Sequence, residues 1–533
     1  MNTVRTDTAV SERAFMSGVV ALTASTVIVK IIGLAYKIPL ISILGAEGMG
    51  YFNTAYEIFA LLCGVSTSGL PVAVSMLVSA ARETGDLAKE RGVYKTSFAL
   101  LVTKGMLFSA LLILFAKPLS GLLGNREAYY AILAISPSLL FSCVAGAIRG
   151  YFQGCRVMSP TAISQLVEAV GKLVFGVALA AIFMSGGASV PVAAAFAVLG
   201  VSLGSFLSAL FLLIRKKIEG NLKKDKNKKT GSYFLALLRI SLPITASSAL
   251  IGGTRMVDMA LIMRRLTLTG ISAARANEIY GSYTTLALPV FLLAPAFIPP
   301  ITENLIPRLS AAVASGALAE QKRAVANAMR LTVFIAMPAS MGVALYSRQI
   351  LSLLFSGQMD AINVSAPLLS VLGASVLFSC LITTTTSVLQ SYGRVMLPII
   401  SLFAGLAVKA VSAYFLIGNV QFGVLGAPIS TLLSNVVVLG LDVLFLRGVI
   451  GGSTGMFSQL PKPFFASLFA MGASFSVYVP LNRMTDGSSF AFLIAFALAI
   501  MTYFFLACVM GVVGSEDLKM IFPSKKKNQY KRP

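Results

Sequence analysis

The sequence predicts an all-α polytopic membrane protein with fourteen transmembrane helices. Hydrophobic residues make up 57% of the 533 residues and charged residues only 12%, whereas soluble proteins are about half apolar and about a quarter charged. The apolar residues also form repeated runs of about 20 residues, the length of a helix that crosses a bilayer. We therefore expect a multi-pass protein of the cytoplasmic membrane, without a separate soluble domain.

The apolar runs define the fourteen spans in order along the chain. They lie at 14–43, 50–81, 95–117, 128–153, 160–185, 190–214, 233–263, 276–309, 324–347, 362–391, 396–418, 423–447, 462–481 and 489–512. Several spans are longer than a bilayer is thick, and prolines such as Pro39, Pro243 and Pro289 lie inside them. Both features favour tilted or bent helices.

Basic residues are distributed unequally between the two sides of the predicted membrane. The largest cluster, 215–229, lies between the sixth and seventh spans, and the segment 519–532 is also basic. The positive-inside rule then places both termini in the cytoplasm. We interpret the clusters as topological signals that also attract anionic membrane lipids. Nucleic-acid binding is not expected, because no binding domain accompanies them.

The chain contains a weak internal repeat. Three segments recur in order: Thr23 to Thr26 as Thr245 to Ser248, Gly85 to Ala88 as Gly316 to Ala319, and Arg156 to Pro160 as Arg394 to Pro398. The repeat covers six helices, an even number, so both copies should enter from the same side and form two parallel six-helix lobes around a central cavity. The predicted division is an N-terminal lobe at 1–214, a basic linker at 215–232, a C-terminal lobe at 233–450, two extra helices at 451–514 and a basic tail at 515–533.

Polar residues follow one face of the first span and one face of the seventh. The two stripes are Thr23, Thr26, Lys30, Gly33 and Lys37, and Ser241, Thr245, Ser248, Gly252 and Arg255. Because these helices are equivalent in the repeat, both stripes should line the same central space. A charge at the bilayer centre costs about 2.5–3.5 kcal/mol and usually faces a cavity or a partner. Cations there indicate an anionic substrate, so Lys30, Lys37, Arg255, Thr26 and Ser248 are predicted to bind it.

The stripes also have a structural interpretation. Small residues form packing faces between membrane helices, and lysines near helix ends extend toward the interface, an alternative that is strongest for Lys37. Arg255 and Asp258, three residues apart, could neutralise each other. Glu57 in the second span could pair with a lysine of the first span or carry a proton. Glu57 and Asp258 are included in the predicted site.

The remaining charged residues and cysteines do not indicate a further site. Glu168 and Lys172 have i, i+4 spacing and are expected to pair with each other. Lys409 lies near the repeat position of Lys172, and Asp442 lies near the end of the twelfth span. The chain has no histidine, its five cysteines lack C-x-x-C spacing, and it has no ATP-binding loop motif. We therefore expect no metal, no cofactor and no enzymatic activity.

Four runs resemble a known family: Lys30 to Pro39, Leu44 to Tyr51, Ser68 to Ser75 and Arg149 to Ala162. They resemble the polysaccharide-biosynthesis transporters of the SpoVB and YtgP type, which belong with MurJ-like lipid II flippases in the MATE-like MOP exporter superfamily. The resemblance covers the whole chain and includes the count of fourteen helices. It implies that the chain moves an undecaprenyl-pyrophosphate-linked sugar across the membrane by alternating access, with lipid II or a related cell-wall or spore-cortex precursor as substrate.

The resemblance also suggests roles for individual residues. In that family, basic residues on helices one and eight, and often two, engage the diphosphate. Lys30 and Lys37 match the helix-one positions, whereas helix two offers Glu57 and helix eight only Arg308 near its end. Arg255 on helix seven would then supply the missing charge. The last two helices would form an apolar groove for the lipid tail, lined by Phe464, Phe465, Phe469, Phe504 and Phe505.

Two other functions stay open at this point. A cation-coupled drug antiporter of the same fold would need acidic residues in its cavity, which Glu57 and Asp258 could supply. A membrane-embedded glycosyltransferase would need exposed carboxylates, and the outer loops offer only Glu47, Glu127, Asp360 and Asp486. The sequence leaves the sugar and any coupling ion undetermined.

Overall fold

The computed structural model describes residues 2–219, 233–299, 302, 309–313, 315–451, 457–485 and 489–512. Within these residues every regular element is helical, and thirteen helical segments are long and apolar enough to cross a membrane. The first of them, Ser25–Glu83, has 59 residues and contains two crossings, as its geometry shows. The predicted fold class is therefore confirmed.

The first two spans form a hairpin within one element, α1 (Asn2–Thr67), which α2 (Gly69–Glu83) continues. At Gly45, φ is 68° and ψ is 177°, a conformation that is essentially restricted to glycine. The ring centroids of Tyr36 and Phe52 lie 5.9 Å apart, although a straight helix would separate these residues by about 24 Å. The chain therefore reverses at Gly45. We call residues 25–44 the first leg and residues 46–67 the second leg.

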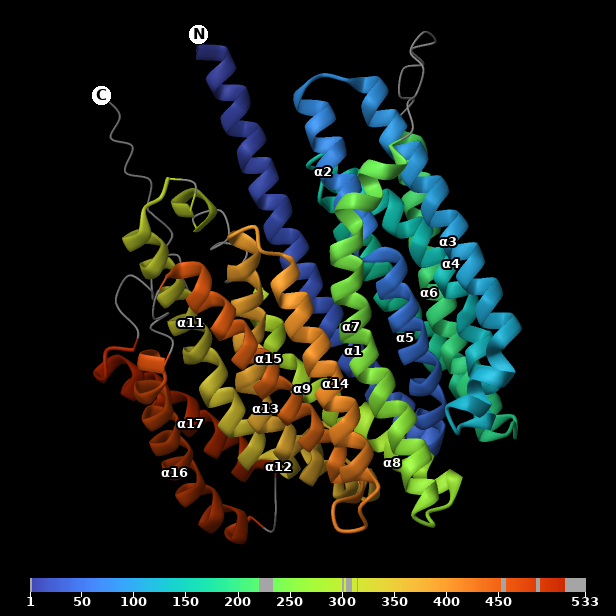
Figure 1. The fold of residues 1–533 in the computed structure, drawn as a ribbon. Helices are drawn as coiled ribbons and strands as arrows, with labels where there is room; N and C mark the ends of the chain where they lie inside the picture. Colours follow the sequence, from blue (N-terminus) through green and yellow to red (C-terminus); the bar gives the residue numbers. More distant parts are fainter. Residues whose placement is uncertain are drawn as a thin grey trace, which may run out of the picture.

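The other helices of the N-terminal half gather beside α1 and α2 in Figure 1, coloured blue to green. They are α3 (Leu87–Leu122), the short η1 (Arg126–Ala128), α4 (Tyr129–Gly154), α5 (Ser159–Ser185) and α6 (Val190–Glu219). Glycines allow α5 and α6 to approach closely, because a Cβ on Gly171 would lie 2.9 Å from the Cα of Gly204. Small residues at such contacts are typical of packed membrane helices.

The helices of the C-terminal half occupy the other side of Figure 1, coloured yellow to orange, with α7 (Phe234–Leu268) between the two groups. They include α11 (Leu318–Leu345), the short α12 (Ser347–Leu354), α13 (Met359–Ser391), α14 (Met396–Ile417), η4 (Gly423–Leu425) and α15 (Gly426–Ile450). Helix α7 contacts α1 and α2 on one side and α14 on the other. It is therefore one of the elements through which the two halves meet, and α8 (Ala273–Ser282) of the eighth span also contacts α1.

The eighth span, predicted at 276–309 with a bend at its prolines, is broken into several short pieces. It consists of α8 (Ala273–Ser282), a π-helical turn η2 (Tyr283–Ala287), α9 (Leu288–Leu293) and a 3-10 turn η3 (Pro295–Phe297). The prolines at positions 289 and 295 lack the backbone N–H that a continuous helix requires. Arg308, the basic residue considered for this span, lies outside the described residues.

The last two helices, α16 (Pro461–Met484) and α17 (Ser489–Val509), pack against α11 after the turn η5 (Phe457–Gln459). The Tyr503 hydroxyl donates to the Phe334 carbonyl across a 2.7 Å contact. The predicted tail 515–533 and most of the predicted linker 215–232 lie outside the described residues. The division of the chain into domains stays a prediction.

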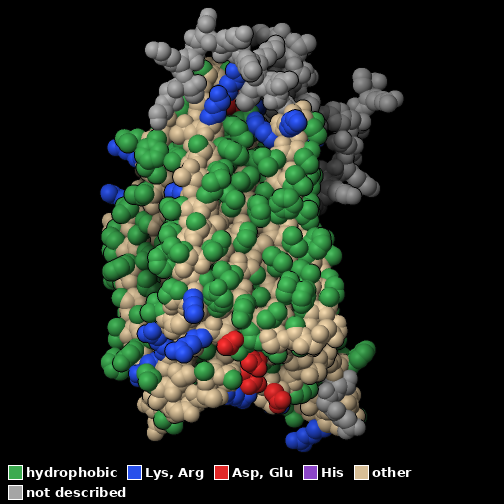
Figure 2. All heavy atoms as spheres, turned by 90° about the vertical axis from the view of Figure 1, so that its right-hand side faces the viewer, with side chains coloured by type: hydrophobic (Ala, Val, Ile, Leu, Met, Phe, Trp, Pro, Cys, Tyr) green, Lys and Arg blue, Asp and Glu red, His purple; other side chains and the backbone are tan. Residues whose placement is uncertain are grey.

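The surface is consistent with a membrane environment. Figure 2 shows one face on which hydrophobic side chains cover the middle of the molecule, while Lys, Arg and acidic side chains gather toward its two ends. A belt of this kind is expected where lipid chains replace water around a helical bundle. The chain is therefore a multi-pass membrane protein.

Candidate functional site

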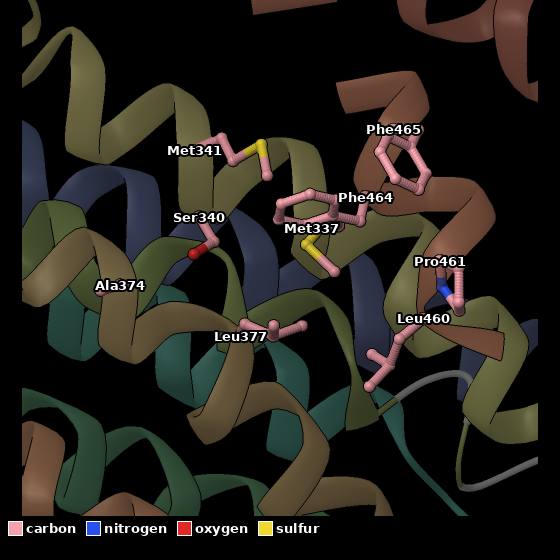
Figure 3. A pocket seen from close by; sticks show the side chains of 9 residues that line it. All are labelled: Met337, Ser340, Met341, Ala374, Leu377, Leu460, Pro461, Phe464 and Phe465. Atoms are coloured by element: carbon pink, nitrogen blue, oxygen red, sulfur yellow. The ribbon is translucent and has the colours of Figure 1, made fainter. Parts of the chain in front are cut away.

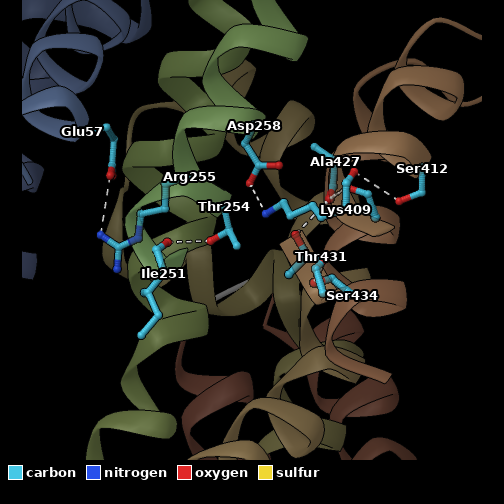
Figure 4. Close-up of polar contacts among 12 residues, drawn as sticks. Glu57, Ile251, Thr254, Arg255, Asp258, Lys409, Ser412, Ala427, Thr431 and Ser434 are labelled. Atoms are coloured by element: carbon cyan, nitrogen blue, oxygen red, sulfur yellow. Dashed lines mark hydrogen bonds and ion pairs between the residues drawn. The ribbon is translucent and has the colours of Figure 1, made fainter. Parts of the chain in front are cut away.

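Arg255 reaches from α7 to the second leg and pairs with Glu57 (Figure 4). Its Nη1 atom lies 3.6 Å from Glu57 Oε2, and the two side chains are 38% and 13% exposed. This distance is too long for a hydrogen bond, and Glu57 Oε2 has no hydrogen-bond partner within the described residues. Of the two possibilities for Glu57, the pair with a lysine of the first span does not form in this conformation, and Arg255 takes its place. The contact is a loose ion pair whose cation stays partly accessible.

Asp258, one turn further along α7, faces the opposite direction and binds Lys409 of α14 (Figure 4). The Lys409 Nζ and Asp258 Oδ2 atoms are 2.8 Å apart, and the side chains are only 5% and 6% exposed. The possibility that Arg255 and Asp258 neutralise each other is thus excluded for this conformation. The consequence is that Arg255 and Asp258 belong to two separate pairs, one loose and one buried.

Lys37 is held by the broken eighth span. Its Nζ donates to the backbone carbonyl of Thr284 over 2.7 Å. In η2 the N–H of Leu288 bonds to the carbonyl of Tyr283, five residues back, and in the same register the next donor would be the N–H of Pro289, which does not exist. The Lys37 ammonium therefore bonds to the carbonyl that the proline leaves without a donor. This bond differs from the alternative interpretation, in which Lys37 extends toward the membrane interface.

Lys30 and Thr26 are exposed on the first leg, one turn apart. Within the described part of the chain, no ion pair or side-chain hydrogen bond involves Lys30. A Cβ added to Gly33 would meet no atom within 4 Å, so the surface beside Lys30 is open. Lys30 therefore has no contact within the described residues that an external anion would have to replace.

The seventh-span stripe packs against the second leg and α2, whereas both stripes were expected to line one central space. A Cβ on Gly252 would lie 2.7 Å from Leu61 Cδ1, and one on Gly64 would lie 3.7 Å from the Cβ of Ser248. A Cβ on Gly69 would collide with the backbone of Ser241. The predicted site residue Ser248 thus lies in a small-residue interface in this conformation, the arrangement that GxxxG-type helix contacts produce.

The expected pair of Glu168 with Lys172 does not form. Glu168 Oε2 instead lies 2.9 Å from Arg149 Nη2 of α4, and the same guanidinium donates to Ser164 and Ser208. Lys172 is partly buried on α5 and takes part in no ion pair within the described residues. The sequence therefore did not reveal Lys172 as an available cation, because the choice of partner depends on α4, which is distant along the chain.

An apolar cavity lies between α11, α13 and α16 (Figure 3). Its volume is about 520 Å³, and it is lined by Met337, Ser340, Met341, Ala374, Leu377, Leu460, Pro461, Phe464 and Phe465. Two of the predicted groove aromatics, Phe464 and Phe465, line it. The contributions of α11 and α13 were not predicted, because periodicity does not show which lipid-facing helices meet. The cavity suits a hydrocarbon chain.

The described residues contain no group of three or more His, Cys, Asp or Glu side chains arranged to hold a metal ion. The cations Lys30, Lys37, Lys172 and Arg255 are instead distributed over three helices, with Glu57 as the acid paired to Arg255. A loose, partly exposed pair contributes about 1 kcal/mol or less. An anion that offers short, charge-assisted hydrogen bonds could replace Glu57 as the partner of Arg255.

Comparisons with known proteins agree with this architecture. Residues 15–313 match the family model described as "Polysaccharide biosynthesis protein", and residues 285–415 match the model "MatE". The chain is 28% identical over 309 residues to stage V sporulation protein B of Bacillus subtilis (strain 168), a match that covers 55% of this chain and 59% of the relative. It is 24% identical over 446 residues to lipid II flippase MurJ of the same organism, covering 80% and 81% of the two chains.

Among solved structures, the inward closed conformation of lipid II flippase MurJ superposes with a TM-score of 0.69 at 15% identity, covering 92% of this chain and 98% of that chain. This likeness establishes a common fold of bundled membrane helices. The family model covers more than half of the sequence, from the first leg of α1 through the broken eighth span. The chain therefore belongs to the polysaccharide biosynthesis protein family.

Proposed function

We propose that this protein is a flippase that moves an undecaprenyl-pyrophosphate-linked sugar precursor from the cytoplasmic to the outer leaflet. Lipid II or a related cell-wall or spore-cortex precursor is the proposed substrate. Both termini would lie in the cytoplasm, as the distribution of basic residues indicates. The protein would catalyse no covalent step and would work by alternating access of its two halves.

The observation that carries this proposal is the contrast between the two ion pairs on α7. Lys409 neutralises Asp258 inside the bundle, whereas the Arg255 guanidinium stays partly exposed and only loosely paired. Lys30 adds a second accessible cation on the first leg. A pyrophosphate has enough oxygen acceptors to bridge two such cations, and bidentate arginine contacts are among the strongest hydrogen bonds in proteins.

The apolar cavity between α11, α13 and α16 supports the lipid part of the proposed substrate. Its walls are methionine, leucine, phenylalanine and proline side chains, with Ser340 as the polar exception. Methionine-rich walls adapt to flexible chains. The polar head and the hydrocarbon tail of one substrate would therefore bind on different helices.

The proposal is tested by translocation of fluorescent lipid II in proteoliposomes that contain the purified full-length protein. Arg255→Ala and Lys30→Ala should each lower the initial rate at least tenfold, because each removes an anchor for the pyrophosphate. Arg156→Ala is the matched control, since its pair with Glu83 is also an Arg–Glu pair but is 61% and 64% exposed. Wild-type rates in both variants would sink the assignment of Arg255 and Lys30 to the substrate.

The second candidate function is a cation-coupled drug antiporter. The match of residues 285–415 to the MatE model favours it, and Glu57 would be the acid that attracts a cationic drug. The two functions differ in substrate charge. Resistance to cationic dyes in a sensitive strain, without rescue of a strain that lacks its precursor flippase, would favour the antiporter.

A further inference from the structure

Asp442 is a buried acid that takes part in neither of the two ion pairs on α7 and has no role in the proposed binding of the substrate. It lies on α15 and is fully buried. Within the described residues it forms no ion pair, and its Oδ1 atom has no hydrogen-bond partner. An unpaired carboxylate in such surroundings is strongly disfavoured, so a buried acid without a cation usually carries a proton.

The hydrogen bonds around Thr385 of α13 support the same protonation state. The Thr385 Oγ1 atom lies 2.8 Å from Asp442 Oδ2 and 3.1 Å from the carbonyl oxygen of Ile382. A threonine hydroxyl has one proton, so it can satisfy only one of two acceptors. A neutral Asp442 removes the conflict, because its O–H donates to Thr385 and the Thr385 proton goes to Ile382.

The groups around Asp442 are hydroxyls and not charges. Besides Thr385, the hydroxyls of Thr386 on α13 and Ser401 on α14 lie beside the carboxyl. No ion pair joins Asp442 to a charged residue within the described part of the packed helices: Lys409 of α14 binds Asp258, and Arg447 of α15 is exposed. A single carboxylate is also a poor site for a hard metal cation, which needs about six oxygen ligands.

We propose that Asp442 is a proton-binding site of the C-terminal half, occupied in this conformation, and that its proton is exchanged during the transport cycle. The step is the addition of a proton to the carboxylate, and its reversal releases that proton to water. Helices α13, α14 and α15 enclose the site, so a movement among them that admits water would stabilise the ionised form. The exchange of the proton rests on the proposed function, whereas the presence of the proton in this conformation does not.

Infrared spectroscopy of the purified full-length protein tests the occupied site directly. The wild type should show the carbonyl absorption of a neutral carboxyl group at neutral pH, and Asp442→Asn should remove it. Thr385→Val should shift this absorption without removing it. This variant provides a second test if Asp442→Asn folds poorly. Asp360→Asn, at an exposed acid on α13, is the control and should leave the absorption unchanged. A spectrum that Asp442→Asn leaves intact would overturn the proposal.

Two further measurements distinguish a bound proton from a bound metal cation and test whether the proton is exchanged. Sodium ions should not raise the melting temperature of the wild type relative to that of Asp442→Asn. A rise in melting temperature that depends on Asp442 would mean that a metal cation, and not a proton, occupies the site. In proteoliposomes, an imposed pH gradient should change the rate of lipid II translocation in the wild type and not in Asp442→Asn. An unchanged gradient response in the variant would overturn the exchange step. If the wild type moves no lipid II, the proposed function fails while the infrared result stands.

Discussion

At the scale of single residues, the pair of Asp258 and Lys409 is a structural connection between α7 and α14. Both side chains are nearly fully buried and their charged atoms are 2.8 Å apart. Removing one partner of a buried pair typically costs about 3–5 kcal/mol, because the other charge stays in a medium that cannot solvate it. We expect Lys409→Met to lower the thermal stability of the detergent-purified protein sharply, and the double variant Asp258→Asn with Lys409→Met to recover most of the loss.

The loose pair provides the comparison for this prediction. Arg255→Ala should lower the melting temperature much less than Lys409→Met, because the Glu57 and Arg255 atoms are 3.6 Å apart and Arg255 is partly exposed. An equal fall in melting temperature in the two variants would mean that the burial of a pair does not determine its contribution to stability. Melting curves followed by intrinsic tyrosine fluorescence would measure both.

The residues of the site could be predicted only in part from the sequence. Intramembrane cations were visible as interruptions of apolar runs, which led to Lys30, Lys37 and Arg255. The partners of the charged residues were not visible in the sequence, because helical spacing suggests only nearby partners. Asp258, for example, pairs with Lys409, which is 151 positions away. The bond between Lys37 and Thr284 depends on a π-helical turn followed by a proline, and its partner carbonyl belongs to a distant span. Pair assignments of this kind need the tertiary structure.

At the scale of elements, the hairpin of α1 depends on Gly45. Its backbone conformation is one that residues with a side chain adopt only at a cost of about 1–3 kcal/mol. We expect Gly45→Ala to destabilise the protein by an amount in this range, measured by thermal unfolding in detergent. Gly33→Ala on the same element is the matched control. A Cβ there meets open space, and alanine favours a helix, so this variant should be neutral or slightly more stable.

Apolar length predicted the spans well because every backbone group in a lipid environment must be bonded within a helix. The same reasoning did not predict the interruption at residues 283–297, where the Lys37 side chain takes over a bond that the backbone lacks. Proline positions indicated bending, but not which carbonyl would be left without a donor. Hydropathy therefore predicts where the chain crosses the membrane better than where a crossing is broken.

At the scale of the whole molecule, the two halves meet in two places: α7 packs on the second leg and on α2, and α8 with η2 packs on α1. In the first contact, Gly252 faces Leu61 and Gly69 of α2 faces Ser241 with little room for a Cβ, and the Arg255–Glu57 pair lies at one end of it. The only charged link of the α7 contact among the described residues is loose, whereas the contact of α8 and η2 with α1 includes the Lys37–Thr284 and Asn53–Thr285 hydrogen bonds. We therefore expect the α7 contact to separate more readily than the contact of α8 and η2 with α1, as a rocking movement in alternating access would require.

Cross-linking tests whether the interface opens during transport. A Cβ on Gly64 would lie 3.7 Å from the Cβ of Ser248, within the 3.5–4.5 Å that a disulfide requires. Gly64→Cys with Ser248→Cys, in a chain whose five native cysteines are replaced, should cross-link on mild oxidation. Translocation of lipid II should then stop and return after reduction, because the disulfide joins the second leg to α7.

The matched control is a disulfide within the N-terminal half. A Cβ on Gly146 of α4 would lie 3.6 Å from the Cβ of Thr67, so Thr67→Cys with Gly146→Cys should cross-link equally well. Both residues belong to elements that would move together, and translocation should therefore continue after oxidation. If the Gly64–Ser248 disulfide forms fully and transport continues, the α7 interface stays closed throughout the cycle, and the substrate must pass between other helices. If both disulfides stop transport, movement within the N-terminal half is part of the cycle, and the two halves do not move as rigid bodies.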